Sequence, residues 1–369
     1  MLYRALGKTG RMVSQLGFGA MRLPMLGEGD TARVDRDKAI AMIRRGFELG
    51  VNYIDTATMY CNSDSQAAVG EALKGWRDKI TVSTKNPYFG EDEKEWFKNL
   101  ETSLKMLDID AIDVYHHHGV NKSSYFDCVV PRVSKWMTKA RDQGLVKHIA
   151  CSFHDKNDTL RAIIETGYPE VITLQYNMLD RGLEDGIALA HQKGIGIIVM
   201  GPVAGGRLAF DSDVLGSMIP GVKRLPELAM RFVLANPNVT VALSGMQAMP
   251  MVEENAVTAS DNRMLTADEL KIIDEHLTRL KSLADLYCTG CRYCLPCPNG
   301  VEIPNVFNHF NQGRIYGMWE HAKKSYDYWH VKRGNSAEKC IDCGECEPKC
   351  PQKLDIRKQL KESHAALTS

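Results

Sequence analysis

Four polar side chains stand at or just after the ends of short apolar segments, and their types suit proton transfer to a carbonyl oxygen. Asp55 ends the apolar segment 51–54, and Tyr60 follows five residues later. Lys85 and His118 end two later apolar segments. A tyrosine can donate a proton if a neighbouring lysine cation stabilises its phenolate and lowers its pKa from about 10. We therefore expect Asp55 to hold Lys85 charged and His118 to hydrogen-bond the carbonyl oxygen.

This chemistry is the reduction of an aldehyde or ketone by hydride, or the reverse oxidation of an alcohol. Taken singly, Asp55 could be only a cap, Tyr60 only a loop aromatic and Lys85 only a lysine at the edge of a sheet. The histidine run 116–118 leaves a choice, because strand alternation puts its first and third members on one face and its second on the other. We choose His118, which lies closest to the end of the strand.

The apolar segments alternate with segments of helical period, and this alternation predicts eight βα units. The predicted strands are 16–19, 51–55, 80–85, 112–117, 148–152, 171–175, 195–200 and 239–243. The predicted helices are 35–49, 65–73, 93–107, 129–143, 159–166, 183–192, 226–235, 251–260 and 267–283. Eight such units in about 285 residues predict an α/β fold, a (β/α)8 TIM barrel, preceded by a hairpin in residues 1–15.

The alternative is a doubly wound open sheet. That fold normally carries Gly-x-Gly-x-x-Gly after its first strand, and the segment 16–21 has only the first two glycines. In the barrel, side chains at the carboxyl ends of the strands meet at one mouth. Asp55, Lys85 and His118 end consecutive strands, so we expect them to lie close together, with Tyr60 above them.

A second group of reactive side chains lies near the C-terminus. Of the 11 cysteines in the chain, eight fall in two short runs. They are Cys288, Cys291, Cys294 and Cys297, then Cys340, Cys343, Cys346 and Cys350. The second run has the spacing of bacterial ferredoxins, and the first is one residue shorter before its last cysteine. Tandem triplets followed by proline favour iron–sulfur clusters over the alternative of two zinc sites.

In two-cluster ferredoxins the fourth cysteine of each run binds the other cluster. By that rule one [4Fe–4S] cluster takes the first three cysteines of the first run with Cys350. The other takes the first three of the second run with Cys297. The remaining cysteines, Cys61, Cys128 and Cys151, are most simply small buried hydrophobic residues, although the place of Cys61 after Tyr60 leaves a role in the site open.

The composition changes after residue 284, where cysteine, proline and aromatic residues replace the βα rhythm. We therefore predict a barrel over residues 1–284 and a small, mainly helical ferredoxin-like domain over 285–369, with helices at 303–316 and 319–329. A net charge of zero argues against general binding to nucleic acid or to anionic membranes. The absence of an apolar leader and the clustered cysteines indicate a cytoplasmic protein.

The motifs around the four polar residues resemble the aldo-keto reductase superfamily. Gly-Val-Asn-Tyr-Ile-Asp-Thr-Ala-x-x-Tyr at 50–60, Ser-Thr-Lys at 83–85 and Asp-Val-Tyr-x-x-His at 113–118 carry this resemblance, which extends over about residues 3–260. It implies an NADPH- or NADH-dependent enzyme acting on a small carbonyl or alcohol. In that family Asp55, Tyr60, Lys85 and His118 match the catalytic four.

The resemblance also implies residues that bind the nicotinamide cofactor. They are Ser152, Gln175, Met200, Gly201, Pro202, Gly205, Arg207, Glu254 and Asn255. Phe153 replaces the asparagine that usually follows the serine, and His154 is a possible substitute. To hold the 2′-phosphate of NADPH, the family usually has a Lys-Ser pair after the last strand and an arginine shortly after it. This chain has Gly245 and Met246 in place of the pair and Met251 near the position of the arginine, which predicts a weakened preference for NADPH.

The tail resembles that of an iron–sulfur subfamily of aldo-keto reductases. It predicts two [4Fe–4S] clusters for electron transfer, which implies a redox partner protein unless the clusters are structural. A redox sensor or electron carrier whose barrel is mainly a scaffold is the alternative function. Four aromatic residues between the cysteine runs are either core or interface. They are Trp319, Tyr326, Tyr328 and Trp329.

Overall fold

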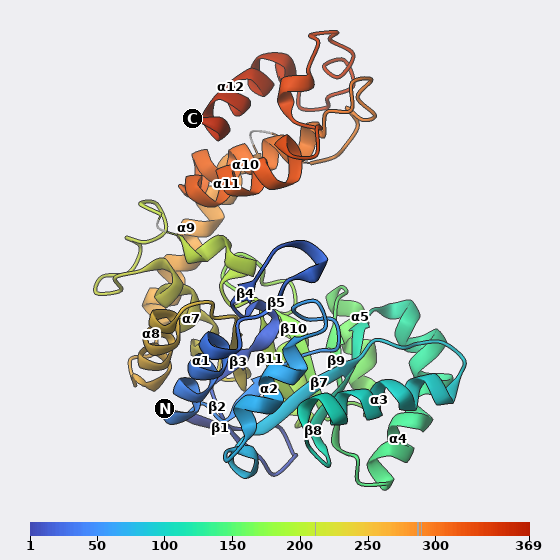
Figure 1. Cartoon of the computed structure of the whole chain (residues 1–369). Helices are drawn as coiled ribbons and strands as arrows, with labels where there is room; N and C mark the ends of the chain where they lie inside the picture. The colour runs from blue at the N-terminus through green and yellow to red at the C-terminus, as the bar shows by residue number, and fades with distance from the viewer. Residues whose placement is uncertain (211, 286–287, 289) are drawn as a thin grey trace. The chain divides into compact units, whose positions relative to one another are not determined.

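Eight parallel strands close into a barrel, which confirms the predicted fold (Figure 1). The computed structural model describes residues 1–210, 212–285, 288 and 290–369. The barrel strands are β3 (Leu16–Gly19), β6 (Tyr53–Asp55), β7 (Thr81–Asn86), β8 (Ile112–Val120), β9 (Val146–Phe153), β10 (Val171–Gln175), β11 (Gly196–Met200) and β12 (Val241–Ser244). They follow one another around the barrel in chain order, and β12 pairs with β3 to close it. The alternative of an open sheet is therefore wrong.

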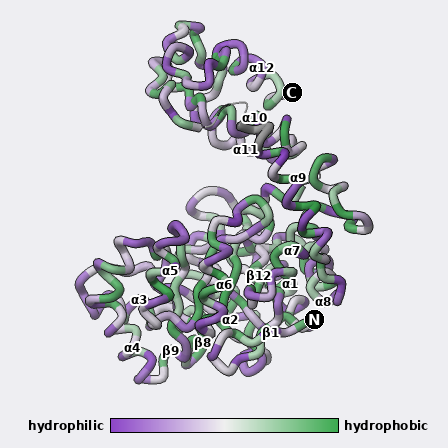
Figure 2. The backbone as a smooth tube through the Cα atoms, turned by 180° about the vertical axis from the view of Figure 1, so that it is seen from behind, coloured by the Kyte–Doolittle hydropathy of each residue, from purple (hydrophilic) through white to green (hydrophobic). Residues whose placement is uncertain are grey.

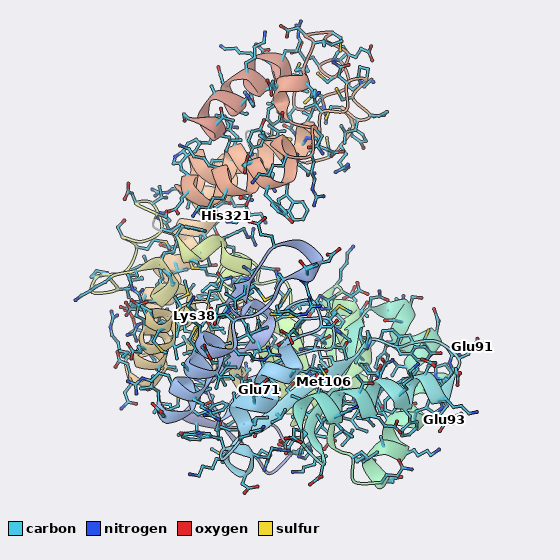
Figure 3. All side chains as sticks on the ribbon, in the orientation of Figure 1. Lys38, Glu71, Glu91, Glu93, Met106 and His321 are labelled. Atoms are coloured by element: carbon cyan, nitrogen blue, oxygen red, sulfur yellow. The ribbon has the colours of Figure 1, made fainter. Side chains whose placement is uncertain are left out.

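Helices follow the strands. They are α1 (Arg36–Glu48), α2 (Ser65–Leu73), α3 (Glu93–Leu107), α4 (Ser134–Asp142), α5 (Asn157–Glu165), α6 (Glu184–Gln192), α7 (Leu225–Ala235), α8 (Met249–Ser260) and α9 (Ala267–Asp285). The barrel strands are largely buried, and β7 and β8 place buried polar side chains among the apolar ones; Figure 2 shows hydropathy along the chain. Charged side chains such as Lys38 on α1 and Glu93 on α3 lie on the outside of the helices, and Glu91 lies in the loop before α3 (Figure 3).

A hairpin of β1 (Tyr3–Ala5) and β2 (Met12–Ser14) precedes the barrel, as predicted. Leu6 and Val13, in and beside this hairpin, are fully buried and pack with Val114 and Val241 from barrel strands. A Cβ on Gly196 at the start of β11 would lie 2.7 Å from the Leu6 side chain. The hairpin therefore plugs the amino-terminal end of the barrel and leaves the carboxyl end for a site.

Local structure departs from the sequence prediction at a few places. The predicted helix 129–143 begins earlier, as a π-helix over Ser124–Val133, and becomes α4 only at Ser134. Pro131 lies in the π-helical part, where its missing N–H interrupts ordinary α-helical bonding. The sequence prediction also missed the short antiparallel pair β4 (Met25–Leu26) and β5 (Arg33–Val34).

Contacts divide the chain into two units, residues 1–204 with 229–264 and residues 205–228 with 265–369. The proposed domain boundary after residue 284 stays a prediction. No helix in the described part of the chain is both long enough and apolar enough to cross a membrane.

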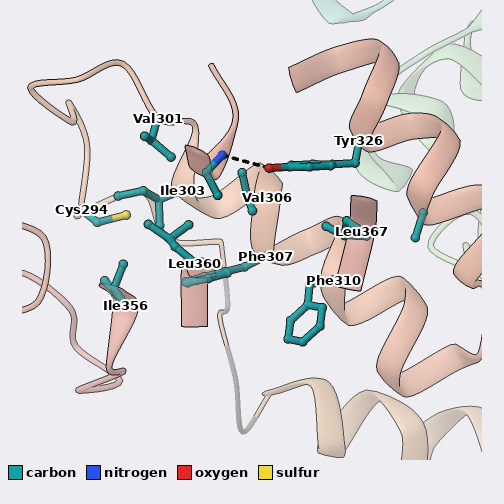
Figure 4. Close-up of a cluster of buried hydrophobic side chains, with 12 residues drawn as sticks. Cys294, Val301, Ile303, Val306, Phe307, Phe310, Tyr326, Ile356, Leu360 and Leu367 are labelled. Carbon is teal, nitrogen blue, oxygen red and sulfur yellow. Dashed lines mark hydrogen bonds between the residues drawn. The ribbon is translucent and has the colours of Figure 1, made fainter. Parts of the chain in front are cut away.

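The second unit contains α10 (Ile303–Tyr316), α11 (Trp319–Tyr326) and a terminal helix, α12 (Ile356–Thr368), that the sequence prediction missed. Its core gathers apolar side chains from all three helices around Phe307 and Leu360 (Figure 4). Tyr326 is fully buried there, and its hydroxyl accepts a hydrogen bond from the Ala337 N–H at 3.0 Å. Trp319 packs against this core, whereas Tyr328 and Trp329 are 55% and 48% exposed.

Candidate active site and cysteine-lined cavities

The strand register brings three of the predicted catalytic residues to one end of the barrel. Asp55 is the last residue of β6 and pairs with Ser83 of β7. Lys85 of β7 pairs with His116 of β8, two residues before His118. These residues therefore lie at the carboxyl ends of three neighbouring strands, as the spacing predicted.

Lys85 makes a buried ion pair at the centre of this site. Its Nζ donates to Asp55 Oδ1 at 2.5 Å and to the Thr56 carbonyl oxygen at 2.8 Å. The Ser83 hydroxyl donates to the other carboxylate oxygen of Asp55 at 2.8 Å. Burial alone would lower the pKa of Lys85, but the charge of Asp55 and the phenol of Tyr60 outweigh it and raise this pKa above its usual value. Lys85 therefore remains a cation although only 2% of the residue is exposed.

Tyr60 lies above this cation. The Lys85 Nζ is 4.9 Å from the centre of the Tyr60 ring, and the His118 ring lies edge-on at 6.1 Å between centroids. Burial raises the pKa of Tyr60, and Lys85 offsets only part of that rise. The expectation of a lowered pKa is thus not met, because the cost of placing a phenolate in this pocket exceeds the stabilisation by Lys85. The phenol is protonated at neutral pH and ready to act as an acid.

His118 is neutral at ordinary pH. Burial, together with the charge of Lys85 and the neighbouring His154, lowers the pKa of His118 to about 4. Its Nδ1 is buried and makes no hydrogen bond with the described residues. A neutral imidazole can donate one hydrogen bond to a carbonyl oxygen without adding a second cation beside Lys85.

The other two histidines of the run serve the barrel itself. His116 Nε2 lies 2.9 Å from the Thr173 hydroxyl oxygen of β10, so this ring lies inside the barrel. His117 points to the opposite face, where its Nε2 lies 3.0 Å from the Tyr168 hydroxyl oxygen and the two rings stack. The predicted alternation is present, and each of these two rings has a hydroxyl partner for its Nε2, whereas the buried Nδ1 of His117 has no hydrogen-bond partner among the described residues.

A left-handed turn after Tyr60 was not expected from the sequence. Cys61, Asn62 and Ser63 have φ values of 52°, 53° and 65°, a conformation that residues other than glycine rarely adopt. The Cys61 thiol lies 3.5 Å from the Met21 carbonyl oxygen, and the Asn62 amide donates to the Gly29 carbonyl oxygen at 2.8 Å. The turn is therefore held by the loop after β3, and no glycine marks it in the sequence.

The cysteines of the second unit line two cavities. Cys288, Cys291, Cys294 and Cys350 line the first, which is closed by apolar side chains such as Phe307. Cys297, Cys340, Cys343 and Cys346 line the second, which Cys294 also borders. The last cysteine of each run thus lines the cavity of the other run.

The chemistry of these thiols fits a positively charged group. Burial raises the pKa of Cys294 to about 11, and it also raises the pKa of Cys288 and Cys346. A thiolate in either cavity therefore needs compensation, which the iron ions of a cluster would supply.

Comparison with known proteins gives the family of each part of the chain. Residues 15–216, more than half of the 369 residues, match the Aldo/keto reductase family. The chain belongs to this family. Residues 287–354 match the 4Fe-4S dicluster domain, so an iron–sulfur domain follows the reductase barrel.

Similar proteins include a curated dehydrogenase and solved structures of aldo-keto reductases. L-galactose dehydrogenase from Arabidopsis thaliana is 27% identical over 311 residues, covering 76% of this chain and 95% of that protein. The holo form of an aldo-keto reductase from Bacillus halodurans is 28% identical with a TM-score of 0.64, covering 75% of this chain and 96% of that one. An aldo/keto reductase from Klebsiella pneumoniae in complex with NADP and acetate shares the fold, with 23% identity and a TM-score of 0.61 over 73% and 93% of the two chains.

Several residues expected to bind the nicotinamide cofactor lie at the same end of the barrel. Gln175 and Met200 are paired last residues of β10 and β11. The Ser152 hydroxyl accepts a hydrogen bond from the Gly119 N–H at 2.8 Å, and Gln175 donates to Asp180 Oδ2 at 3.1 Å. Phe153 is buried, so it does not replace the missing asparagine.

The remaining expected contacts are placed as follows. Gly201, with a φ of 68°, and Pro202 follow β11 directly. Glu254 and Asn255 lie on α8, and the Asn255 amide donates to the Ser244 hydroxyl at the end of β12 at 3.0 Å. Gly205 and Arg207 belong to the second unit by their contacts. Gly245 and Met251 are both exposed, and neither side chain carries a charge.

Proposed function

We propose that this chain is an NAD(P)H-dependent reductase of aldehydes or ketones, or in reverse a dehydrogenase of alcohols, with Tyr60 as its general acid and base. The observation that carries the proposal is the stack of Asp55, Lys85 and Tyr60, in which a buried cation lies 2.5 Å from a carboxylate oxygen and 4.9 Å from the centre of a phenol ring. Ser152, Gln175, Met200 and Asn255, at the same mouth, are suited to hold the nicotinamide cofactor.

When bound, the nicotinamide cofactor supplies a hydride to the carbonyl carbon. The electron pair of the C=O π bond moves to oxygen as the new C–H bond forms. Tyr60 then gives its phenolic proton to that oxygen, and Lys85 stabilises the phenolate that remains. His118, held neutral, donates a hydrogen bond that orients the carbonyl. In the oxidation direction the same phenolate accepts the proton of the alcohol.

Replacing Tyr60 tests this role. Tyr60→Phe keeps the ring above Lys85 but removes the proton, so we expect turnover in a screen of carbonyl substrates to fall by about 10²–10⁴-fold while cofactor binding stays. Tyr3→Phe is the matched control, because the Tyr3 hydroxyl donates to the Gly50 carbonyl oxygen before β6, at the far end of the barrel. Unchanged turnover in Tyr60→Phe would favour the alternative of an electron carrier whose barrel is a scaffold.

We further propose that the C-terminal domain holds two [4Fe–4S] clusters that carry single electrons to or from a redox partner protein in the cytoplasm. Two cavities, one lined by four cysteines and the other by four cysteines and Cys294, support two clusters. Cys343→Ala tests the route. If dye-linked electron transfer with the nicotinamide cofactor survives in this variant, the clusters are structural.

We also propose that the preference for NADPH over NADH is weak. Phosphate groups are held by paired positive charge or by several donors. Gly245 and Met251 supply neither, and both nucleotides should therefore be compared in direct binding.

A further inference from the structure

One arginine of the second unit carries a buried donor that lacks an acceptor. Although 41% of the Arg357 side chain is exposed, its Nε is buried and makes no hydrogen bond with any residue that the structure describes. Its Nη2 donates to Glu347 Oε2 at 2.9 Å, and its backbone N–H donates to Glu347 Oε1 at 3.1 Å. Glu347 thus holds the end of the side chain without using the Nε–H. Buried donors in proteins normally have a partner, so this one indicates an acceptor beside it.

The Arg357 side chain lines the second cysteine cavity, together with Cys343 and Cys346. Gly344 lies between these two cysteines in the sequence. A Cβ added to Gly344 would lie 3.7 Å from Arg357 Cζ and 3.8 Å from its Nε. The guanidinium therefore lies over the loop that carries two of the predicted cluster ligands.

The first cavity has no equivalent donor. At the start of α12, Ile356 lines the first cavity, and Leu360 lines the second together with Arg357 (Figure 4). Arg292 lines the first cavity, but its side chain is 56% exposed and lies 3.4 Å from a carboxylate oxygen of Glu302. Among the described residues that line the first cavity, none has a buried side-chain donor without a partner. The two cavities therefore differ by one buried N–H.

We propose that Arg357 donates its Nε–H to the [4Fe–4S] cluster of the second cavity and raises the reduction potential of that cluster. This inference rests on the proposed function, since it assumes that both cavities hold clusters. The acceptor is a sulfur atom, because hydrogen bonds to the sulfurs are one of the factors that set cluster potentials. Reduction adds one electron, and hence one negative charge, without breaking a bond. A donor on a cationic group stabilises the reduced form more than the oxidised form, so Arg357 favours the second cluster as the one that holds the electron.

Arg357→Lys separates the donor from the charge. Lysine keeps a cation that can pair with Glu347, but it has no N–H at the position of Nε. We expect the equilibrium constant for reduction of the second cluster to fall by about tenfold, as for the loss of a hydrogen bond to a charged group, which is about 59 mV for one electron. The potential of the first cluster should stay unchanged.

Redox titration of the anaerobically purified full-length protein, followed by paramagnetic resonance, measures both potentials without any turnover. The signal that Cys343→Ser alters belongs to the second cluster. Arg333→Lys is the matched control and should change neither potential, because Arg333 packs 4.2 Å from the centre of the Trp329 ring and lines neither cavity. If Arg357→Lys keeps the wild-type potential, or if both clusters shift equally, the inference is wrong.

A measurement on the wild-type protein covers the case in which Arg357→Lys does not assemble its clusters. With arginine labelled by heavy nitrogen, pulsed paramagnetic resonance should detect an arginine nitrogen coupled to the reduced second cluster. If two clusters are present and this coupling is missing, the inference fails and the proposed function stands. If the wild-type protein does not contain two clusters, the proposed function of the domain fails as well.

Discussion

At the scale of single residues, the ion pair of Lys85 and Asp55 sets the protonation of the whole site. Lys85 is almost fully buried, and burial by itself disfavours its charge. Asp55 restores that charge, and the resulting cation lowers the pKa of Tyr60, against the effects of burial and of Asp55 itself. The carboxylate therefore acts on the reaction through the lysine, without touching the substrate.

Asp55→Asn should expose this dependence as a change in the pH profile. Without the carboxylate, burial dominates and the pKa of Lys85 falls far below its raised value, so that nearly all of the lysine is neutral at neutral pH. We expect turnover at pH 7 to fall by about 100-fold and to recover as the pH is lowered, because protonation restores the cation. Rates measured between pH 5 and 9 check this, and a uniform loss at every pH would contradict it. Thermal melts show whether the variant is folded.

Residue types at strand ends were enough to find the catalytic candidates. Consecutive strands of a barrel lie side by side, so residues that end successive strands are close together. Asp55, Lys85 and His118 illustrate this. The left-handed turn at residues 61–63 could not be found in that manner, since no glycine marks it in the sequence. The direction of the Tyr60 pKa also required the structure, because it depends on the amount of burial.

At the scale of elements, the left-handed turn 61–63 connects the end of β6 to α2 and sets the position of Tyr60. Each residue other than glycine in this conformation costs about 1–2 kcal/mol. Hydrogen bonds from Cys61 and Asn62 to the carbonyl oxygens of Met21 and Gly29 offset this cost. Strain of this kind often accompanies functional sites.

Ser63→Gly should relieve part of this strain. Ser63 is exposed and has a φ of 65°, so a glycine there avoids the steric penalty but adds freedom to the unfolded chain. We expect a net gain of about 0.5–1 kcal/mol in the free energy of unfolding, with turnover unchanged. Ser63→Ala keeps the penalty and is the control. A glycine variant that melts below the alanine variant would show that the turn is not strained at this position.

The elements themselves were largely predictable. β3, β10, α2, α3 and α10 have the predicted bounds, because period and apolar content coincide there. The π-helix around Pro131 and the two-residue strands β4 and β5 were missed, since their bonding depends on loop contacts that leave no period in the sequence.

At the scale of the whole molecule, the chain joins a reductase barrel to an iron–sulfur domain. The proposed barrel chemistry moves two electrons as hydride, whereas each of the proposed clusters would exchange one electron at a time. The number of clusters and their ligands therefore decide whether the domain can accept both electrons of a hydride. The last cysteine of each run lines the cavity of the other run, and this arrangement predicts which four cysteines bind each cluster.

If the fourth cysteine of each run binds the cluster of the other run, Cys297→Ser should damage the same cluster as Cys343→Ser, and Cys350→Ser the same cluster as Cys288→Ser. Anaerobically purified wild-type protein should contain about eight irons per chain, and each variant about half as many or a cluster with an altered signal. Paramagnetic resonance of the reduced proteins distinguishes the two clusters and so pairs the variants. Cys128→Ser, in the barrel, is the control and should match the wild-type spectrum.

If Cys297→Ser instead pairs with Cys288→Ser, each run holds its own cluster, and the short spacing before Cys297 is an adaptation to that uncrossed arrangement. Colourless protein with zinc in place of iron would reject both arrangements, because zinc cannot accept an electron from the barrel.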